Sequence, residues 1–194
     1  SASKVGTESV VAAWQQIAKV SGGPRVISVR AGNVIGGGDF AADRLLPDII
    51  RGLTTGTTIQ IRNPESTRPW QHVLDPLSGY LKLLEISIDG NTHVESMNFG
   101  PELESLSVEK VLSIFEESWP ARIKKEIIMA EGNVEAQNLQ LDSNFARSEL
   151  NWRPMWTQEN AVRATANWWN SVTNLGISPK EASQFDITFL LNGA

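Results

Sequence analysis

Two short apolar segments dominate the fold that this sequence can adopt. Residues 25–34 are rich in β-branched side chains and show almost no polar alternation, and residues 95–99 form another short apolar segment. Strands with this pattern are typical of the interior of a parallel sheet, where both faces are covered. The other predicted strands are shorter, so the sequence offers few strands for a sheet core.

The connection between these two segments is about sixty residues long and contains a strand and helices of its own. Strands and helices therefore alternate, which indicates an α/β fold. Apolar spacing and cap residues predict helices over 4–20, 45–53 (ending near Gly52), 75–87 (N-cap Asp75), 107–119 (N-cap Ser107), 143–152 and 157–172 (N-cap Thr157), with a further helix after Ser178. Short strands are predicted over 58–64, 124–130 and 139–142. The pattern is that of the second half of a nucleotide-binding fold with an inserted substrate region.

Composition excludes several classes of function. The net charge of −5 argues against a nucleic-acid-binding face, which has to be basic. The chain has no cysteine and only two histidines, so neither a disulfide framework nor a typical zinc site is expected. No apolar run reaches the ~20 residues of a membrane span and no signal peptide is visible. We therefore expect a cytoplasmic protein with no nucleic-acid or membrane partner and no metal.

Several motifs resemble one enzyme family. The opening SASK, followed by a helix, resembles the end of the Tyr-x-x-x-Lys signature of short-chain dehydrogenases/reductases, with the tyrosine expected just before Ser1. RAGNVIGGGDFAADRLLPDIIRG resembles the strand end and substrate loop of the extended members, which act on nucleotide sugars. IRNPESTRPWQHVLDPLSGYL resembles their Arg-Asp-x-x-x-Val-x-Asp block, with Pro69 in place of the usual aspartate. MNFGP, LQLDSNFARSELNWRPMW and AVRATANWW resemble their carboxyl-terminal part. The residues of these motifs are most similar to those of the members that dehydrate CDP-glucose.

The resemblance implies the carboxyl-terminal half of an extended short-chain dehydrogenase fold, with a few parallel strands and helices plus a small α/β substrate-binding region. It divides the chain into 1–34, the tail of the nucleotide-binding domain, and 35–94, a substrate-binding insertion. Residues 95–120 would hold the last strand and helix of the nucleotide-binding fold, and 121–194 a carboxyl-terminal substrate-binding subdomain. No Gly-x-Gly-x-x-Gly motif occurs in the sequence, and we expect the cofactor-binding half to be missing.

The resemblance also assigns site residues. Asn33 would contact the nucleotide sugar, and Arg44 and Arg68 its diphosphate, since a planar guanidinium suits phosphate. The backbone from Ile61 to Asn63 would meet the cytosine base. Lys4 would be the catalytic lysine that holds the nicotinamide ribose of NAD and lowers the tyrosine pKa. The alternatives are a turn asparagine for Asn33, ion pairs with Asp43, Asp48 or Asp75 for the arginines, and a solvated surface lysine for Lys4.

Other features have structural interpretations beside functional ones. Gly36, Gly37 and Gly38 either bring backbone close to the sugar or form a flexible loop. Trp70 and His72 either shape the pocket or support Arg68, with packing favoured for Trp70 and a structural hydrogen bond for His72. The tryptophans at 152, 156, 168 and 169 are expected in the core and at interfaces.

Three functions remain open at this point. The first is a fragment of an NAD-dependent nucleotide-sugar dehydratase, a lyase that converts CDP-glucose to CDP-4-keto-6-deoxyglucose in deoxysugar or O-antigen biosynthesis, inactive on its own and without bound NAD. The second is a truncated remnant that binds nucleotide sugar weakly or only self-associates. The third is another epimerase or dehydratase of the same superfamily. An uncovered parallel strand edge favours a homo-oligomer.

Overall fold

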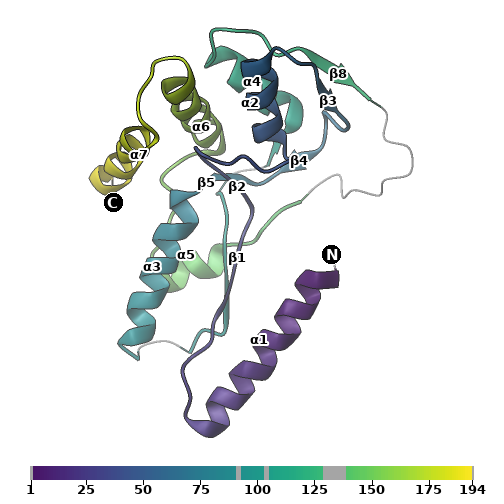
Figure 1. Ribbon diagram of the computed structural model, residues 1–194. Coiled ribbons are helices and arrows are strands. Elements are labelled where there is room, and N and C mark those ends of the chain that lie inside the picture. Colours follow the sequence, from purple (N-terminus) through teal and green to yellow (C-terminus); the bar gives the residue numbers. More distant parts are fainter. Residues whose placement is uncertain (1, 91–92, 103–104, 129–138, 194) are drawn as a thin grey trace.

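The computed structural model describes residues 2–90, 93–102, 105–128 and 139–193 (Figure 1). The first helix is α1 (Ala2–Ser21), and none of its residues is buried. The same part of the molecule contains β1 (Ser28–Ala31) and β6 (Ser96–Phe99), and α3 (Leu74–Ile88) and α5 (Asn144–Leu150) pack against β6. The other elements gather at the top of Figure 1 and form a second group.

The two strands predicted for the interior of a parallel sheet do pair in parallel, since β1 pairs with β6 and Val29 lies opposite Met97. The prediction that they are interior strands was wrong for the described residues: β1 and β6 form a two-stranded sheet, and Val29 is 39% exposed. However, the segment predicted as one strand over 25–34 is divided, because β2 (Asn33–Ile35) leaves β6 and pairs in parallel with β5 (Trp70–His72). The division falls at Gly32, where a Cβ would lie 2.7 Å from the carbonyl oxygen of Pro69. A residue without a side chain is required where two backbones approach this closely.

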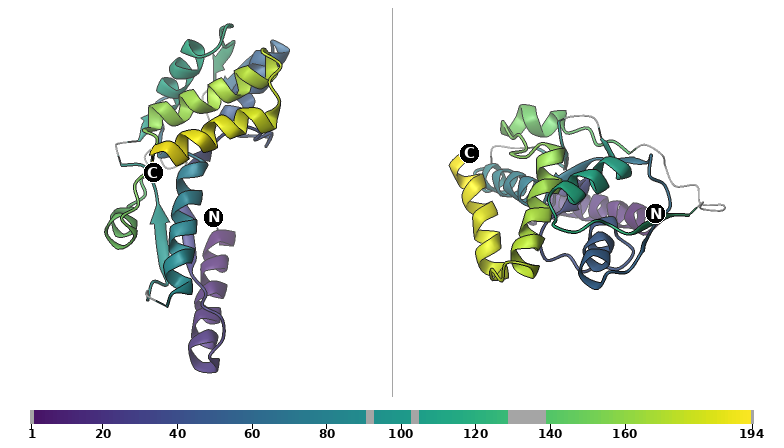
Figure 2. Two further views of the ribbon diagram at one scale, coloured as in Figure 1. Left: turned by 90° about the vertical axis from the view of Figure 1, so that its left-hand side faces the viewer. Right: turned by 90° about the horizontal axis from the view of Figure 1, so that it is seen from above.

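Two further strand pairs complete the second group. β3 (Ile59–Ile61) pairs in parallel with β8 (Lys125–Ile127), and β4 (Thr67–Arg68) pairs in antiparallel with β7 (Leu106–Ser107). The helices of this group are α2 (Leu45–Thr55), α4 (Val108–Glu117), α6 (Gln158–Thr173) and α7 (Pro179–Gly193). In both views of Figure 2, α6 and α7 lie side by side.

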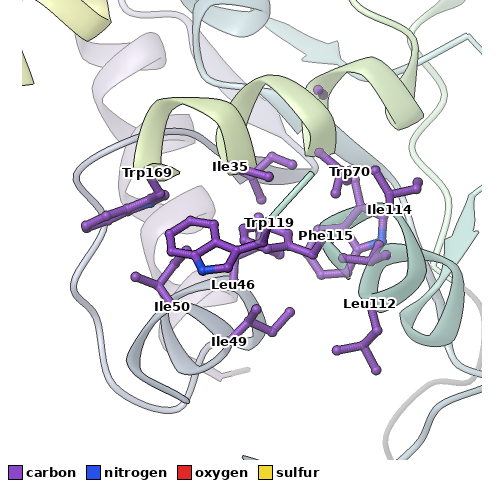
Figure 3. Packing of buried hydrophobic residues seen from close by; sticks show 14 of the residues in the cluster. Ile35, Leu46, Ile49, Ile50, Trp70, Leu112, Ile114, Phe115, Trp119 and Trp169 are labelled. Atoms are coloured by element: carbon purple, nitrogen blue, oxygen red, sulfur yellow. The ribbon is translucent and has the colours of Figure 1, made fainter. Parts of the chain in front are cut away.

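Two hydrophobic clusters hold the chain together. The upper cluster collects buried side chains from α2, α4, α6 and the strands between them, and Figure 3 labels Ile49, Phe115 and Trp70 among its residues. The lower cluster collects Met97, Phe99 and Trp152 with residues of α3 and α5. The four tryptophans at 152, 156, 168 and 169 are all less than 8% exposed, so their predicted place in the core is confirmed.

Cap residues predicted the starts of two helices correctly. The Ser107 side chain accepts a hydrogen bond from the backbone N–H of Lys110 at the start of α4, and Thr157 accepts one from Asn160 at the start of α6. Such bonds satisfy backbone donors that a helix start leaves without an intrahelical partner.

Three local predictions were wrong. Asp75 is not an N-cap, because α3 begins at Leu74 and the Asp75 carboxylate binds a distant backbone N–H. α2 does not end near Gly52 but continues to Thr55, and Gly56, with a φ of +71°, is its C-cap. Residues 139–142 form no strand; the carbonyl of Leu139 accepts instead from the Ser105 side chain.

Polar contacts tie α1 to the neighbouring strands. The Glu8 carboxylate accepts hydrogen bonds from both Nε and Nη2 of Arg30 in β1, at 2.7 and 2.6 Å. The Arg30 guanidinium lowers the pKa of Glu8. Near the other end of the helix, Gln15 Nε2 donates to the backbone carbonyls of Val26 and Glu95. The helix is thus held at its polar face, while its apolar side chains remain exposed.

Candidate functional site

A cavity with a volume of about 620 Å³ lies in the second group of elements. Its walls come from β2, β3, β4, the loop before α2 and α2 itself. Small-molecule sites usually have volumes of a few hundred to a thousand Å³, so this cavity is large enough for a nucleotide-sized ligand. Much of its apolar wall belongs to the upper cluster: Ile35, Leu46, Ile59, Ile61, Trp70 and Trp169.

Asn33 enters the wall through strand pairing. It is the first residue of β2, directly after the carboxyl end of β1, and lies opposite Trp70 of β5. Its backbone N–H donates to the Pro69 carbonyl at 3.0 Å, so that interaction fixes the position of the residue. Ligands of open α/β sheets bind beyond the carboxyl ends of parallel strands, which is where Asn33 is found.

Arg44 and Arg68 also line this cavity. Arg44 directly precedes α2 and lies 3.4 Å from the carboxylate of Asp39, with 64% of its side chain exposed. An ion pair at this exposure contributes little to stability. The pairing partner is Asp39, which was not among the carboxylates considered from the sequence. Arg68 is half-buried in β4, and its Nη1 donates to the Thr67 carbonyl at 2.7 Å.

Arg62 is a third arginine of the wall, and sequence reasoning missed it. It directly follows β3 and its side chain is exposed. The only available signal was its place between Ile61 and Asn63, two positions that the sequence had already assigned to the ligand. The cavity wall contains as many arginines as aspartates: Arg44, Arg62 and Arg68, and Asp39, Asp43 and Asp48. The formal charge of these six residues is therefore zero.

The negative side of this wall is partly neutralised within the protein. Asp39 faces Arg44, and Asp48 pairs with Arg51, which is outside the cavity lining. Asp39 also accepts a hydrogen bond from the backbone N–H of Ala41 at 2.9 Å.

Ile61 and Asn63 line the cavity as well, but their carbonyls already have partners. The Ile61 carbonyl accepts from the backbone N–H of Ile128 at 2.9 Å, and the Asn63 carbonyl accepts from Ser66 at 3.2 Å. Ile61 itself is 3% exposed and belongs to the upper cluster. Its side chain therefore shapes the apolar wall, and the Asn63 side chain is the polar group available at this position.

Two of the three glycines at 36–38 have a role in packing or in the turn of the loop, and one lies at the cavity wall. Gly36 is part of the wall, while a Cβ on Gly37 would lie 1.9 Å from Cδ2 of the Trp168 ring. Gly38 has a φ of +80°, which favours glycine. Two of the three glycines are thus explained by the close approach of this loop to α6 and by its turn.

Lys4 is not among the described residues that line the cavity. It is exposed in the first turn of α1, a helix that does not belong to the second group of elements. The Gly-x-Gly-x-x-Gly motif typical of dinucleotide sites is absent from the printed sequence. The lysine assigned to the cofactor and the residues assigned to the substrate therefore lie in different places among the described residues.

Trp70 and His72 connect the site to the core behind it. Trp70 is 5% exposed and contributes to the cavity wall. His72 points away from it: the ring is 1% exposed, stacks on Trp156 at 4.3 Å between centroids, and places Nε2 3.4 Å from the carboxylate of Asp186 in α7. His72 is thus a buried core residue.

Neither a metal nor a membrane site emerges from the part of the chain described here. Among those residues, no three histidine or acidic side chains gather as metal ligands would. Likewise, no helix in the described ranges combines the length and the apolar character needed to cross a bilayer.

The sequence is similar to a known nucleotide-sugar dehydratase. It is 39% identical over 155 residues to the CDP-glucose 4,6-dehydratase of Salmonella typhimurium, a match that covers 75% of this chain and 41% of the dehydratase. No protein-family model matches the chain.

Solved structures of similar fold come from the same superfamily. The UDP-glucose-4-epimerase of Stenotrophomonas maltophila, with bound NAD and formylated UDP-arabinopyranose, matches 90% of this chain and 55% of its own with a TM-score of 0.72 at 17% identity. The dTDP-glucose 4,6-dehydratase of Bacillus anthracis, in complex with NAD, matches 88% of this chain and 51% of its own with a TM-score of 0.70 at 17% identity. The fold is therefore that of extended short-chain dehydrogenases, and the chain spans about half the length of the proteins it matches.

Proposed function

We propose that this chain, which resembles CDP-glucose 4,6-dehydratase in sequence and the extended short-chain dehydrogenases in fold, is the part of such a dehydratase that binds the nucleotide sugar. The observation that carries the proposal is a convergence. Five residues assigned to the substrate from sequence motifs, Asn33, Arg44, Ile61, Asn63 and Arg68, line one cavity although they lie in separate elements. Such convergence is expected for a site and not for scattered surface residues.

The chemistry of the wall suits a nucleoside diphosphate sugar. Guanidinium groups bind phosphate oxygens through paired hydrogen bonds. Trp70, Trp169 and Ile61 offer apolar surface for a base or a sugar ring. The Asn33 and Asn63 amides supply donors and acceptors that fit hydroxyl groups. In this arrangement the protein binds and orients the sugar nucleotide, and Arg68 holds its diphosphate.

In this proposal different segments of the chain have different roles. Residues 35–94 supply most of the wall and would form the substrate-binding insertion, and residues 121–194 would support it through Trp169. The dehydration also requires NAD, which would oxidise and later reduce the sugar. The printed sequence contains no Gly-x-Gly-x-x-Gly motif and Lys4 is not among the described lining residues, so we propose that the chain binds the sugar nucleotide without completing the reaction.

A second candidate is supported by the fold neighbours. The epimerase structure contains a UDP-linked sugar, so a uridine nucleotide sugar is the competing ligand. The 39% identity to a dehydratase that acts on CDP-glucose favours the cytidine ligand. Binding assays with both sugar nucleotides distinguish the two candidates.

The experiment is a phosphorus NMR titration with CDP-glucose and UDP-glucose. We expect CDP-glucose to bind with a Kd on the order of 1 mM, since the contacts are incomplete and ligand ordering is costly. Arg68→Ala should weaken binding by about tenfold, which is the loss expected for one charge-assisted hydrogen bond. Arg25→Gln is the matched control, because Arg25 lies on the separate surface around α1 and should leave binding unchanged. Equal binding by the wild type and Arg68→Ala would contradict the role of Arg68, and tighter binding of UDP-glucose would favour the second candidate.

A further inference from the structure

Gln158 has a polar side chain at a buried position, where an apolar side chain is more usual. It is the first residue of α6, immediately after the N-cap Thr157, and is 3% exposed. Buried amides are retained at a free-energy cost unless their polar atoms are hydrogen-bonded. The contacts of this amide therefore indicate what it does.

The Gln158 Oε1 atom joins two strands that are distant in sequence. It accepts a hydrogen bond from the backbone N–H of Trp70 at 3.0 Å and another from the backbone N–H of Leu106 at 3.4 Å. The indole Nε1 of Trp70 donates in turn to the Leu106 carbonyl at 3.2 Å. One carbonyl oxygen thus fixes β5 and β7 to each other and to the start of α6.

Arg68 lies between these two fixed points. It is opposite Leu106 in the β4–β7 pair and two residues before Trp70. β4 contains only Thr67 and Arg68, so its own ladder supplies few hydrogen bonds to hold the arginine backbone. Both Arg68 and Trp70 line the cavity. A shift of the Trp70 or Leu106 backbone would therefore move the Arg68 guanidinium along the wall.

We propose that Gln158 is the positioning residue for Arg68 and sets the affinity of the cavity for the diphosphate of the sugar nucleotide. This proposal rests on the proposed function, in which Arg68 binds that diphosphate. Gln158 does not touch the cavity, because it is absent from the described lining, and acts through Trp70 and Leu106. Small displacements of a binding group weaken a bidentate interaction strongly, since both hydrogen bonds depend on its orientation.

The test is a double-mutant cycle on CDP-glucose binding, measured by phosphorus NMR at a temperature where each variant is folded. Gln158→Leu keeps the volume of the side chain but removes the acceptor, which leaves two buried N–H groups without it. We expect binding about tenfold weaker than in the wild type. In the Arg68→Ala background the same substitution should have no additional effect, because the group that it positions is gone.

Two controls separate positioning from general destabilisation. Thr165→Val removes a different buried polar group of α6, the Thr165 hydroxyl, which donates to the Ala161 carbonyl at 2.9 Å. This variant should have a lower melting temperature but unchanged binding. Gln158→Met, with an unbranched side chain, repeats the measurement if the leucine variant does not fold. Wild-type affinity in both Gln158 variants would overturn the proposal, as would effects of Gln158→Leu and Arg68→Ala that multiply. Unchanged binding in Arg68→Ala alone would instead overturn the proposed role of Arg68 itself.

Discussion

The carboxylate of Asp75 accepts a hydrogen bond from the backbone N–H of Met155 at 2.6 Å and so joins α3 to the segment that precedes α6. Asp75 is 1% exposed, and its second oxygen, Oδ2, has no hydrogen-bond partner among the described residues. His72 is buried nearby and stabilises the charge on Asp75 electrostatically. A single acidic group thus connects the two clusters of the fold.

Burial raises the pKa of Asp75 to about 6, from 3.8 in the unfolded chain. The folded state therefore holds the proton more tightly, and the Asp75 contribution to stability is greatest below the unfolded pKa and falls as the pH rises through 6. The loss is at most about 3 kcal/mol. The measurement is the free energy of unfolding in urea for the wild type and Asp75→Asn across this pH range. We expect the wild type to lose stability relative to the variant as the pH rises; a difference independent of pH would disprove the assignment.

Substitution of Arg62 tests the part of the wall that sequence reasoning missed. Arg62→Gln removes one guanidinium from the cavity while keeping a polar side chain. If this arginine meets the diphosphate, CDP-glucose should bind about three- to tenfold more weakly, which is the effect of one charge-assisted hydrogen bond at an exposed position. Lower salt should enlarge the difference. An unchanged Kd at low salt would exclude Arg62 from the site.

Two glycine-to-alanine substitutions should have opposite effects on stability. Gly37→Ala introduces a Cβ against the Trp168 ring and should destabilise the protein by about 1–3 kcal/mol, because loop and helix must separate. Gly6→Ala lies in α1 with nothing within 4 Å and should stabilise its helix by about 0.5–1 kcal/mol. Thermal unfolding compares the two. A tolerated Gly37→Ala would show that the loop does not rest on Trp168 in solution.

The exposed face of α1 should promote self-association. Val10, Trp14 and Ile17 are 58%, 57% and 52% exposed, and contiguous apolar surface of this kind is usually covered by another surface. Light scattering at micromolar concentration is expected to give a mass above that of the monomer. Trp14→Lys should shift the mass toward the monomer, whereas Leu191→Lys on α7 should not. A monomer mass for the wild type would refute the prediction.

The purified 194-residue chain should not convert CDP-glucose to a 4-keto-6-deoxy product, with or without added NAD. The reason is the lack of a glycine-rich dinucleotide motif in its sequence and the absence of Lys4 from the described cavity lining. Lys4→Ala should also leave CDP-glucose binding unchanged. Product above the level of a protein-free control would contradict the prediction.

The sequence predicted those features that depend on nearby residues. The caps at Ser107 and Thr157 were correct because a cap needs only the next helical turn. The strand character of β1 and β6 was predicted from their apolar composition, whereas their pairing with each other joins residues about seventy positions apart and was not predicted. The division at Gly32 could not be predicted, because it depends on Pro69, which contacts it only in the folded chain.

The candidate site divides in the same way. Asn33 and Arg68 were accessible through sequence motifs, and the fold places both in the cavity wall. Gln158 gave no signal, since a glutamine at the start of a helix is usually solvated, and only the folded chain brings it to Trp70 and Leu106. Residues that act through a neighbour are invisible to motif reasoning for this reason.

The division of the interior into two hydrophobic clusters has a consequence for the cooperativity of unfolding. The apolar residues at the cavity wall belong to the upper cluster, whereas β6 and α5 depend on the lower one. Regions with separate cores open as separate units, each with its own free energy. A ligand in the cavity will therefore slow amide hydrogen exchange in α2, α4 and α6 and leave the exchange of β6 and α5 almost unchanged.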